Sequence, residues 1–468
     1  MKKLTAIFGI TLSLVFAHLQ AQVIIQENLP ATKRLETDIR LLASDSLLGR
    51  ESGTPGEYMA RKYIESEFKQ IGLTPLFDTS YFQAFAFKDE AFVDLGTQMT
   101  LNGKKLQLYV DYYPLGFSAN QSVQGDMVFA GNGLVNPEAG MNDYSQCGSV
   151  SGKIVLLDLS VPDSLYETKS IWDSAQKIVR VKRAQALGAK AVVFFSSNTL
   201  YGDPMKKPAF YTDSVGIAVM YLQKPDFIDT KNPGTVSFTV NINRSGTRIG
   251  HNVGGYMDNK AKTTVVIGAH YDHLGMGFFS TRDPGVYDVH NGADDNASGV
   301  AGVLELARQL KNADLKNNNY IFLAFSGEEK GLFGSMFFMK SNYYPKQKLN
   351  YMLDLDMIGR LKPTNKLQIF GMSASGAWGN TITKVEHPGL KIVKPKIDLG
   401  GSDHMSFNMY GVPAILIITG LHPDYHKAVD DANLINFEGE NRIVNYLINL
   451  IAYLNDKGKL EFKNAVRK

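Results

Sequence analysis

The chain has 468 residues, of which 49 are Lys or Arg, 46 are Asp or Glu and one is Cys. This length predicts two or three domains, and a composition of 44% hydrophobic and 20% charged residues excludes disorder, collagen and coiled coil. The single cysteine, Cys147, excludes an intramolecular disulfide framework and a cysteine-rich metal site. A net charge of +3 is too small for a nucleic-acid binder that must neutralise many phosphates.

The first 21 residues are typical of a secretory signal peptide. Lys2 and Lys3 precede an apolar run, and Ala21 offers a small residue for cleavage. The run is shorter than the roughly 20 residues that a bilayer-spanning helix needs. We therefore expect an exported protein, periplasmic or extracellular, with no transmembrane segment after signal removal.

The predicted elements begin with helices from Thr32 to about Leu73, around a Gly/Pro-containing loop at Ser52–Gly56. A β-hairpin is expected next, with strands at Thr97–Leu101 and Leu106–Val110 and a turn at Asn102-Gly103. These elements, within residues 22–114, are assigned to the first part of an α/β domain.

The sequence pattern changes over residues 115–232, where short apolar runs are divided by loops rich in Gly, Asn, Asp and Pro. The strands expected there are Met127–Ala130, Ile154–Leu159, Ala191–Phe195 and Gly216–Met220. One helix is expected at Ile178–Leu187, before Gly188. This pattern predicts a compact β-rich module inserted into the α/β domain.

From residue 233 to 468, strands alternate with helices. The strands expected are Val236–Ile242, Thr264–Gly268, Tyr320–Phe325, Tyr351–Leu355, Leu367–Phe370 and Ala414–Thr419, and the main helices are Gly299–Leu310 and Ile435–Leu454. The alternation predicts a mostly parallel sheet covered by helices on both faces.

Histidines are absent between Val23 and Gly250: of nine, one lies in the leader and eight lie at or after His251. In this second half, ionisable side chains follow the ends of successive predicted strands. They are His270 and Asp272, Asp294 and Asp295, Glu328 and Glu329, Asp356, and His426 with Asp430. The ends of parallel strands meet at one edge of a sheet, so these groups should converge.

Such a set of nitrogen and oxygen donors, with no thiolate, suits a pair of zinc ions, with cobalt or manganese as substitutes. Taken singly, Asp294-Asp295 could be a helix cap and Glu328-Glu329 a solvated acidic pair. Their common placement at one sheet edge favours a metal centre. Of two adjacent glutamates beyond a strand, one can bind metal while the other acts as a general base.

In this order the residues resemble the co-catalytic di-zinc aminopeptidase family, which includes secreted bacterial leucine aminopeptidase and glutamate carboxypeptidase II. The resemblance implies the zinc exopeptidase fold, a mixed and mostly parallel sheet flanked by helices. It implies that two zinc ions are held by His270 and Asp356, by Glu329 and His426, and by Asp295 as the bridge. It also implies that Glu328 is the general base acting on metal-bound water.

The same resemblance gives roles to neighbouring residues. Asp272 would orient His270, Asp430 would act similarly near His426, and Tyr425 would stabilise the oxyanion. It implies a cis peptide bond at Asp295-Asn296. Only motif alignment favours Asp295 over Asp294 as the bridge, and His404 competes with His426 as the last ligand. His273 and His290 are expected outside the ligand set.

The inserted module, with Gly152–Val155 and Gly188–Val192, resembles a protease-associated domain, which would shape the substrate entrance. The predicted function is therefore an exported di-zinc aminopeptidase that acts on peptides. A carboxypeptidase, a one-zinc glutaminyl-cyclase-like enzyme and a non-catalytic peptide-binding relative remain alternatives. No oligomeric state is predicted.

Overall fold

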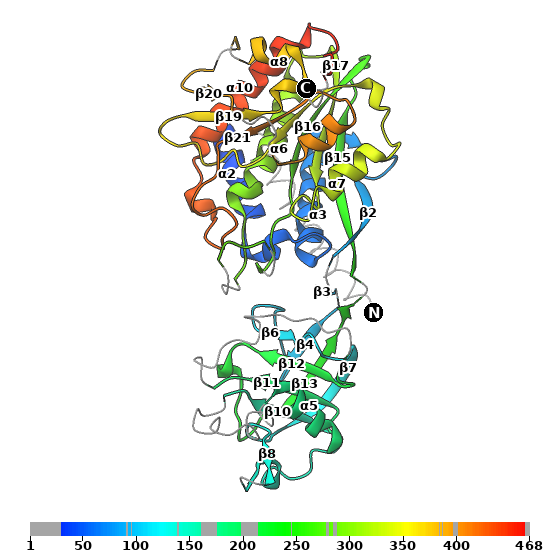
Figure 1. Ribbon diagram of the computed structural model, residues 1–468, viewed down its shortest axis with the longest axis vertical. Helices are drawn as coiled ribbons and strands as arrows, with labels where there is room; N and C mark the ends of the chain where they lie inside the picture. Colours follow the sequence, from blue (N-terminus) through cyan, green and yellow to red (C-terminus); the bar gives the residue numbers. More distant parts are fainter. Residues whose placement is uncertain are drawn as a thin grey trace, which may run out of the picture. The chain divides into compact units, whose positions relative to one another are not determined.

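The structure is a computed structural model that describes residues 30–89, 92–94, 96–137, 140–160, 176–197, 214–244, 246–277, 280–283, 288–382, 384–385, 387–395 and 401–463. Its described residues form two compact units (Figure 1). The first unit comprises the residues up to Phe87 and most of those from Ile249 onward, and the second comprises Lys88–Arg248. The second unit includes more residues than the insertion predicted at 115–232. The signal peptide predicted at residues 1–21 lies outside the described residues.

The first unit is built on a nine-stranded mixed sheet with the order β1-β15-β17-β16-β18-β21-β19-β20, and β2 pairs with β15 beside this path. The strands are β1 (Thr74–Pro75), β2 (Phe82–Lys88), β15 (Thr247–Met257), β16 (Thr263–His270), β17 (Asn318–Phe325), β18 (Leu349–Leu355), β19 (Lys366–Phe370), β20 (Lys391–Val393) and β21 (Ala414–Ile418). Strands β17, β16, β18 and β21 run parallel at the centre. The mixed α/β class is therefore as predicted.

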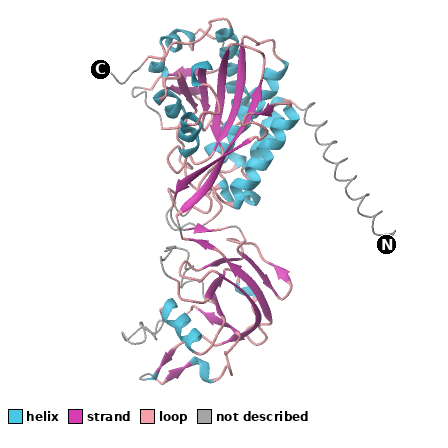
Figure 2. Cartoon of the chain, turned by 90° about the vertical axis from the view of Figure 1, so that its right-hand side faces the viewer, coloured by secondary structure: helices cyan, strands magenta, loops and turns pink. Residues whose placement is uncertain are grey.

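Helices lie on both faces of this sheet (Figure 2). They are α2 (Ala31–Leu42), α3 (Pro55–Ile71), α6 (Gly299–Asn312), α7 (Phe333–Lys340), α8 (Gly376–Thr381), α9 (His404–Met409) and α10 (Phe437–Asn455). Successive strand residues point to opposite faces. Val265 and Ile267 accordingly join the core formed with α2, α3, α6 and α10, whereas Val266 joins the core formed with α7 and α9. Burial on both faces explains why the central strands are continuous apolar runs.

The second unit contains an eight-stranded sheet with the order β5-β4-β13-β7-β10-β11-β12-β6 and one longer helix, α5 (Lys177–Ala186). Its strands are β4 (Gln98–Leu101), β5 (Lys104–Lys105), β6 (Tyr112–Pro114), β7 (Gln121–Phe129), β10 (Ile154–Asp158), β11 (Ala191–Phe195), β12 (Ala218–Leu222) and β13 (Thr235–Val240). Two short strand pairs join β3 (Phe92–Val93) with β14 (Ile242–Asn243) and β8 (Val135–Asn136) with β9 (Met141–Asn142). This sheet has a core of its own.

Three strand predictions were wrong or incomplete. The strand expected at Leu106–Val110 is a turn, because the Asp111 carboxylate accepts the Gln107 N–H at 2.9 Å and Tyr109 has a φ of 66°. Strand β13, expected in the α/β domain, pairs with β7 and β4 of the second unit. Strand β15 was missed because it is rich in glycine; a Cβ at Gly255 would lie 2.7 Å from Leu73. The described residues contain no helix long and apolar enough to cross a bilayer.

A buried charge network joins three helices on one face of the sheet. Arg308 on α6 donates to Asp38 on α2 at 2.8 Å and to Glu67 on α3 at 2.7 Å. The Asp38 side chain is fully buried, so its carboxylate depends on this partner. Burial and the charge of Asp38 raise the pKa of Glu67 to about 6, despite the opposing effect of Arg308.

We expect Arg308→Met to lower the free energy of unfolding by about 3–5 kcal/mol, because it leaves two buried carboxylates without a cation. The control is Lys33→Met on α2, which removes an exposed pair with Glu36 and should change stability by less than about 1 kcal/mol. Urea denaturation of both variants measures the difference. Equal losses in the two variants would contradict the structural role given to Arg308.

Candidate metal centre

The carboxyl ends of three neighbouring parallel strands supply the centre. His270 is the last residue of β16, Asp356 follows β18 directly, and Glu329 lies in the turn after β17. The turn η8 (Ala293–Ser298) places Asp295 among them. His270 Nε2 lies 3.3 Å from Asp295 Oδ1 and 3.5 Å from Asp356 Oδ1. These three side chains offer ligand atoms within 4.8 Å of one another, as one metal ion requires.

A second group forms on the other side of the same aspartate. His426 Nε2 lies 3.2 Å from Asp295 Oδ2 and 3.2 Å from Glu329 Oε2. One oxygen of Asp295 therefore faces each of the two histidines. The structure brings together all five residues that the sequence nominated as metal ligands, and their side chains are largely buried.

The neighbouring Asp294 has a different environment. Its Oδ1 accepts the Gly359 N–H at 2.7 Å and the Ser298 hydroxyl at 3.1 Å, and its Oδ2 lies 3.2 Å from His422 Nε2. The peptide bond after Asp295 is cis, as the family resemblance implied. Of the two adjacent aspartates, Asp295 is the one that faces both His270 and His426.

A third imidazole, His273, lies closer to the centre than predicted. Its Nδ1 is 2.8 Å from Glu329 Oε1 and 3.9 Å from Asp295 Oδ2. Its ring meets the His426 ring edge to face at 5.8 Å. His273 thus forms a geometric ligand group with Asp295 and Glu329. The spacing His270-x-x-His273 was the only signal in the sequence that could have placed it here.

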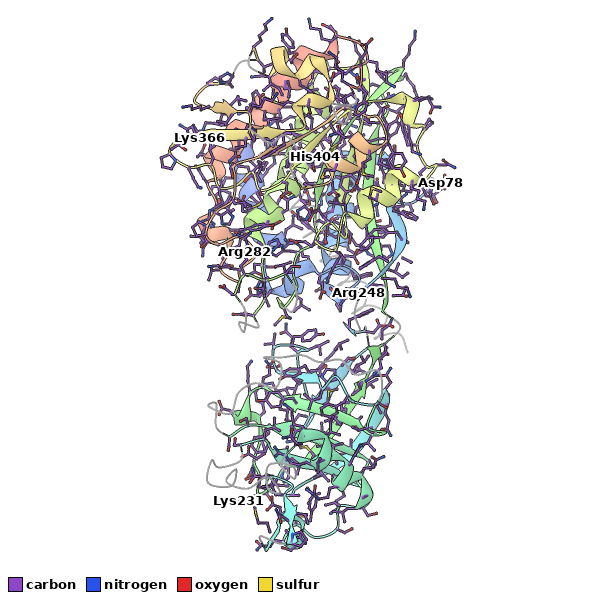
Figure 3. The ribbon with its side chains drawn as sticks, in the orientation of Figure 1. Asp78, Lys231, Arg248, Arg282, Lys366 and His404 are labelled. Atoms are coloured by element: carbon purple, nitrogen blue, oxygen red, sulfur yellow. The ribbon has the colours of Figure 1, made fainter. Side chains whose placement is uncertain are left out.

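Two other histidines lie apart from these ligand groups. His404 lies at the start of α9 (Figure 3). Its main-chain N–H donates to Asp354 Oδ2 at 2.7 Å, and its ring Nδ1 is 3.4 Å from the same oxygen. His290 Nε2 pairs with the Thr281 hydroxyl at 2.9 Å. The geometry therefore favours His426 over His404 as the last ligand.

The residues expected to orient the histidines act partly on other groups. His270 Nδ1 is 3.1 Å from the main-chain oxygen of Asp272, whose carboxylate Oδ1 is farther away at 3.7 Å. Asp430 Oδ2 accepts the N–H groups of Asp294 and Asp295, both at 3.0 Å, so it holds the bridging segment. His426 Nδ1 instead faces the Ser280 carbonyl oxygen at 2.9 Å.

Glu328 and Glu329 are adjacent but have opposite electrostatic environments. Burial raises the pKa of Glu328 well above its usual range, and Glu329 and Asp356 add to the effect despite the opposing charge of His270. Glu329 is also disfavoured by burial, yet hydrogen bonds from His273 and His426 lower its pKa to about 2. Such a divided pair is a common arrangement for separate acid–base and charge-binding roles.

Tyr425 packs directly on the last predicted ligand. Its ring stacks on His426 with centroids 3.9 Å apart, and the Arg282 guanidinium lies 4.5 Å from the Tyr425 ring centre. Burial raises the pKa of Tyr425, and the charges of Asp295 and Glu329 add to the shift. The phenol therefore keeps its proton and can act as a hydrogen-bond donor.

The donor set fits zinc. It consists of imidazole nitrogens and carboxylate oxygens, which are common zinc ligands. Asp356 Oδ1 and His273 Nε2 are buried and accept or donate no hydrogen bond within the described part of the chain. Four acidic side chains in this volume would repel one another without cations, and a metal pair removes that repulsion.

Comparisons with known proteins identify a peptidase family for the second half of the chain. Residues 252–451 match the model of peptidase family M28. The family resemblance drawn from the sequence is thereby confirmed.

Several curated relatives of this chain are named aminopeptidases. Aminopeptidase YwaD of Bacillus subtilis is 27% identical over 273 residues, which cover 55% of this chain and 56% of YwaD. The probable leucine aminopeptidase of Trichophyton verrucosum is 33% identical over 184 residues, 36% of this chain and 47% of the relative. The probable lipoprotein aminopeptidase LpqL of Mycobacterium tuberculosis is 28% identical over 295 residues, 62% of this chain and 51% of LpqL. The chain spans about half the length of these relatives.

Two solved structures that align with this chain are a zinc aminopeptidase and a glutaminyl cyclase. BSAP, a zinc aminopeptidase from Bacillus subtilis, aligns with a TM-score of 0.49 and 21% identity over 94% of this chain and 98% of its own. The Porphyromonas gingivalis glutaminyl cyclase aligns with a TM-score of 0.38 and 19% identity over 45% of this chain and 79% of its own.

We expect zinc binding to release protons at pH 8. Although burial opposes it, hydrogen bonds to Asp295 and Glu329 raise the pKa of His426 to about 10 in the metal-free protein. The imidazole is therefore protonated at pH 8, and a metal ligand must be neutral. Calorimetric titration of chelated protein in buffers of different ionisation enthalpy should show proton release, and zinc affinity should rise with pH up to about 10.

The control for this titration is His426→Asn, which should release about one proton fewer. Binding heats that do not depend on the buffer would contradict the protonation assigned to His426.

Proposed function

We propose that this protein is an exported di-zinc aminopeptidase that removes N-terminal residues from peptides. The observation that carries the proposal is the position of Asp295, which presents one oxygen to His270 and the other to His426. The aminopeptidase names of the relatives support the reaction class. The signal peptide predicted at residues 1–21 supports export.

The residues of the centre divide between two ions. His270 and Asp356 would hold one zinc, Glu329 and His426 would hold the other, and Asp295 would touch both. His426 is preferred to His273 because its Nε2 is equally close to Asp295 and Glu329, while its Nδ1 is occupied by the Ser280 carbonyl. When bound, the ions supply Lewis-acid polarisation of the scissile carbonyl and lower the pKa of water.

Glu328 would act as the general base. Its carboxyl group lies next to the ligand Glu329 and has a raised pKa, which suits a group that must accept and then return a proton. It would take the proton of the attacking water and pass it to the nitrogen of the leaving amine. Tyr425, which keeps its phenolic proton, would donate a hydrogen bond to the oxyanion.

The second unit is proposed to be a protease-associated domain. Its compact sheet and separate core support an independent module. It lacks histidine, so a role in shaping the substrate entrance is more consistent with its composition than a role in catalysis.

Two ligand groups that share Asp295 favour an enzyme with two ions over a one-zinc cyclase. Purified protein should therefore contain about two zinc ions per chain and cleave aminoacyl-anilides, whereas N-blocked peptides should be poor substrates. Metal analysis and paired assays on free and blocked substrates test this. Equal cleavage of blocked peptides would favour the carboxypeptidase alternative, and one tightly bound zinc would favour the cyclase.

We expect Glu328→Gln to keep both metals and lower kcat by about 10²–10⁴-fold, because the amide cannot accept the proton. The matched control is Glu440→Gln, which changes a fully buried glutamate on α10 and should leave kcat unchanged. Metal content and steady-state kinetics are measured on both. Near-normal turnover of Glu328→Gln would remove the general-base assignment.

A further inference from the structure

The loop between η1 (Asp45–Arg50) and α3 contains the Gly/Pro-containing motif noted in the sequence, to which the proposed chemistry gives no role. We call residues 49–57 the brace loop. Its side chains Arg50 and Ser52 are at most 1% exposed. Both contact the segments that carry the metal ligands, although they lie more than 200 positions earlier in the chain.

Arg50 binds main-chain oxygens rather than carboxylates. Its guanidinium donates to the carbonyl oxygens of Leu42 at 2.5 Å, Tyr271 at 2.8 Å, Asn291 at 2.6 Å and Gly292 at 3.0 Å. Burying a cation is costly unless its donors are paired, and here four carbonyls accept four of the five N–H groups of the guanidinium. Tyr271 follows the ligand His270, and Asn291-Gly292 leads into the turn that carries Asp295. One side chain therefore ties together two ligand-bearing segments.

Ser52 connects the segment after β16 with the turn after β17. Its hydroxyl donates to Asp272 Oδ2 at 2.8 Å and accepts the Gly327 N–H at 2.9 Å. The other oxygen of Asp272 accepts the Glu328 N–H at 3.2 Å. Two successive N–H groups, directly before Glu329, are thus anchored by Ser52 and Asp272. This arrangement fixes the turn that presents Glu328 and Glu329 to the centre.

The main chain of the brace loop also lies against the ligand half. Gly49 has a φ of 65°, and a Cβ there would lie 2.4 Å from the Gly275 carbonyl oxygen. At the other end, the Glu57 carboxylate accepts the N–H groups of Gly53 at 3.0 Å and His251 at 2.7 Å. The loop is held at both ends, so its two central side chains have defined positions.

We propose that Arg50 and Ser52 are positioning residues, which hold the strand-end turns of the metal centre and so set its affinity for the metal pair and the placement of Glu328. The effect on Glu328 rests on the proposed function, whereas the effect on metal affinity does not. Groups that orient metal ligands in this way change metal affinity or activity by about 10–100-fold when removed.

The first test is Ser52→Ala, which removes one hydroxyl. We expect the zinc Kd, measured by chelator competition, to rise by about 10–100-fold. At saturating zinc, kcat should fall while KM changes less than about twofold. The substitution shifts the turn that carries Glu328 and leaves the substrate contacts in place. The visible absorption spectrum of the cobalt-loaded protein should shift, since cobalt reports the geometry of its ligands.

The matched control is Thr264→Val at the opposite end of β16. It removes a buried hydroxyl that bonds to Tyr344 Oη at 2.5 Å, in the same strand as His270. Its urea midpoint should fall, but its zinc Kd and cobalt spectrum should match the wild type. Arg50→Lys is the second variant, because it keeps the charge but cannot reach four carbonyls; its zinc Kd should also rise at least about tenfold.

Wild-type zinc Kd and cobalt spectra in both Ser52→Ala and Arg50→Lys would overturn the proposal. The proposal would also be overturned if Thr264→Val raised the zinc Kd and shifted the cobalt spectrum as Ser52→Ala does, because the changes would then reflect lost stability alone. If the wild-type protein binds zinc but cleaves no aminoacyl substrate, the proposed function fails. The zinc Kd and the cobalt spectrum of the variants then still test the positioning role of Arg50 and Ser52.

Discussion

The structure of the first unit depends on one electrostatic constraint: Asp295, Glu328, Glu329 and Asp356 share a small buried volume. Burial alone would drive protons onto all of them. The imidazoles of His273 and His426 oppose this at Glu329 and lower its pKa, while the pKa of Glu328 stays high despite the charge of His270. The parallel sheet makes the arrangement geometrically simple, because its strands end at one edge. The same edge must then be held rigidly enough to keep like charges together.

That rigidity comes from the main chain as much as from side chains. Asp430 accepts the successive N–H groups of Asp294 and Asp295. In the turn after β17, Ser52 accepts the Gly327 N–H and Asp272 accepts the Glu328 N–H. Arg50 supplies the complementary interaction by donating to carbonyls. The turns that carry Asp295 and Glu329 are therefore fixed by polar groups from a distant part of the chain. The supporting shell is built from residues that look ordinary in the sequence.

The sequence predicted the features that depend on local pattern. Central strands buried on both faces appear as apolar runs, and the proposed ligands His270 and Asp356 lie where those runs end. What it could not predict depends on contacts between distant segments. Nothing near Arg50 or Ser52 indicates that they reach Tyr271 or Asp272, and nothing near His273 shows that its ring turns toward Glu329. Strand β15 was missed because its glycines reflect close packing by Leu73 and Phe85, not a break in the sheet.

The division of the first unit into two stretches of chain has a consequence for the order of folding. The second unit has its own core, and its described residues all precede Ile249 in the chain. The first unit cannot close until β21 and His426 have been made, because β21 pairs with the central strand β18. Arg50 alone needs a partner, Tyr271, that lies 221 positions later in the chain. Contacts of such long range slow folding. The protein should therefore pass through a stage in which the second unit is formed and the N-terminal helices are still without their sheet, with zinc able to bind only at the end.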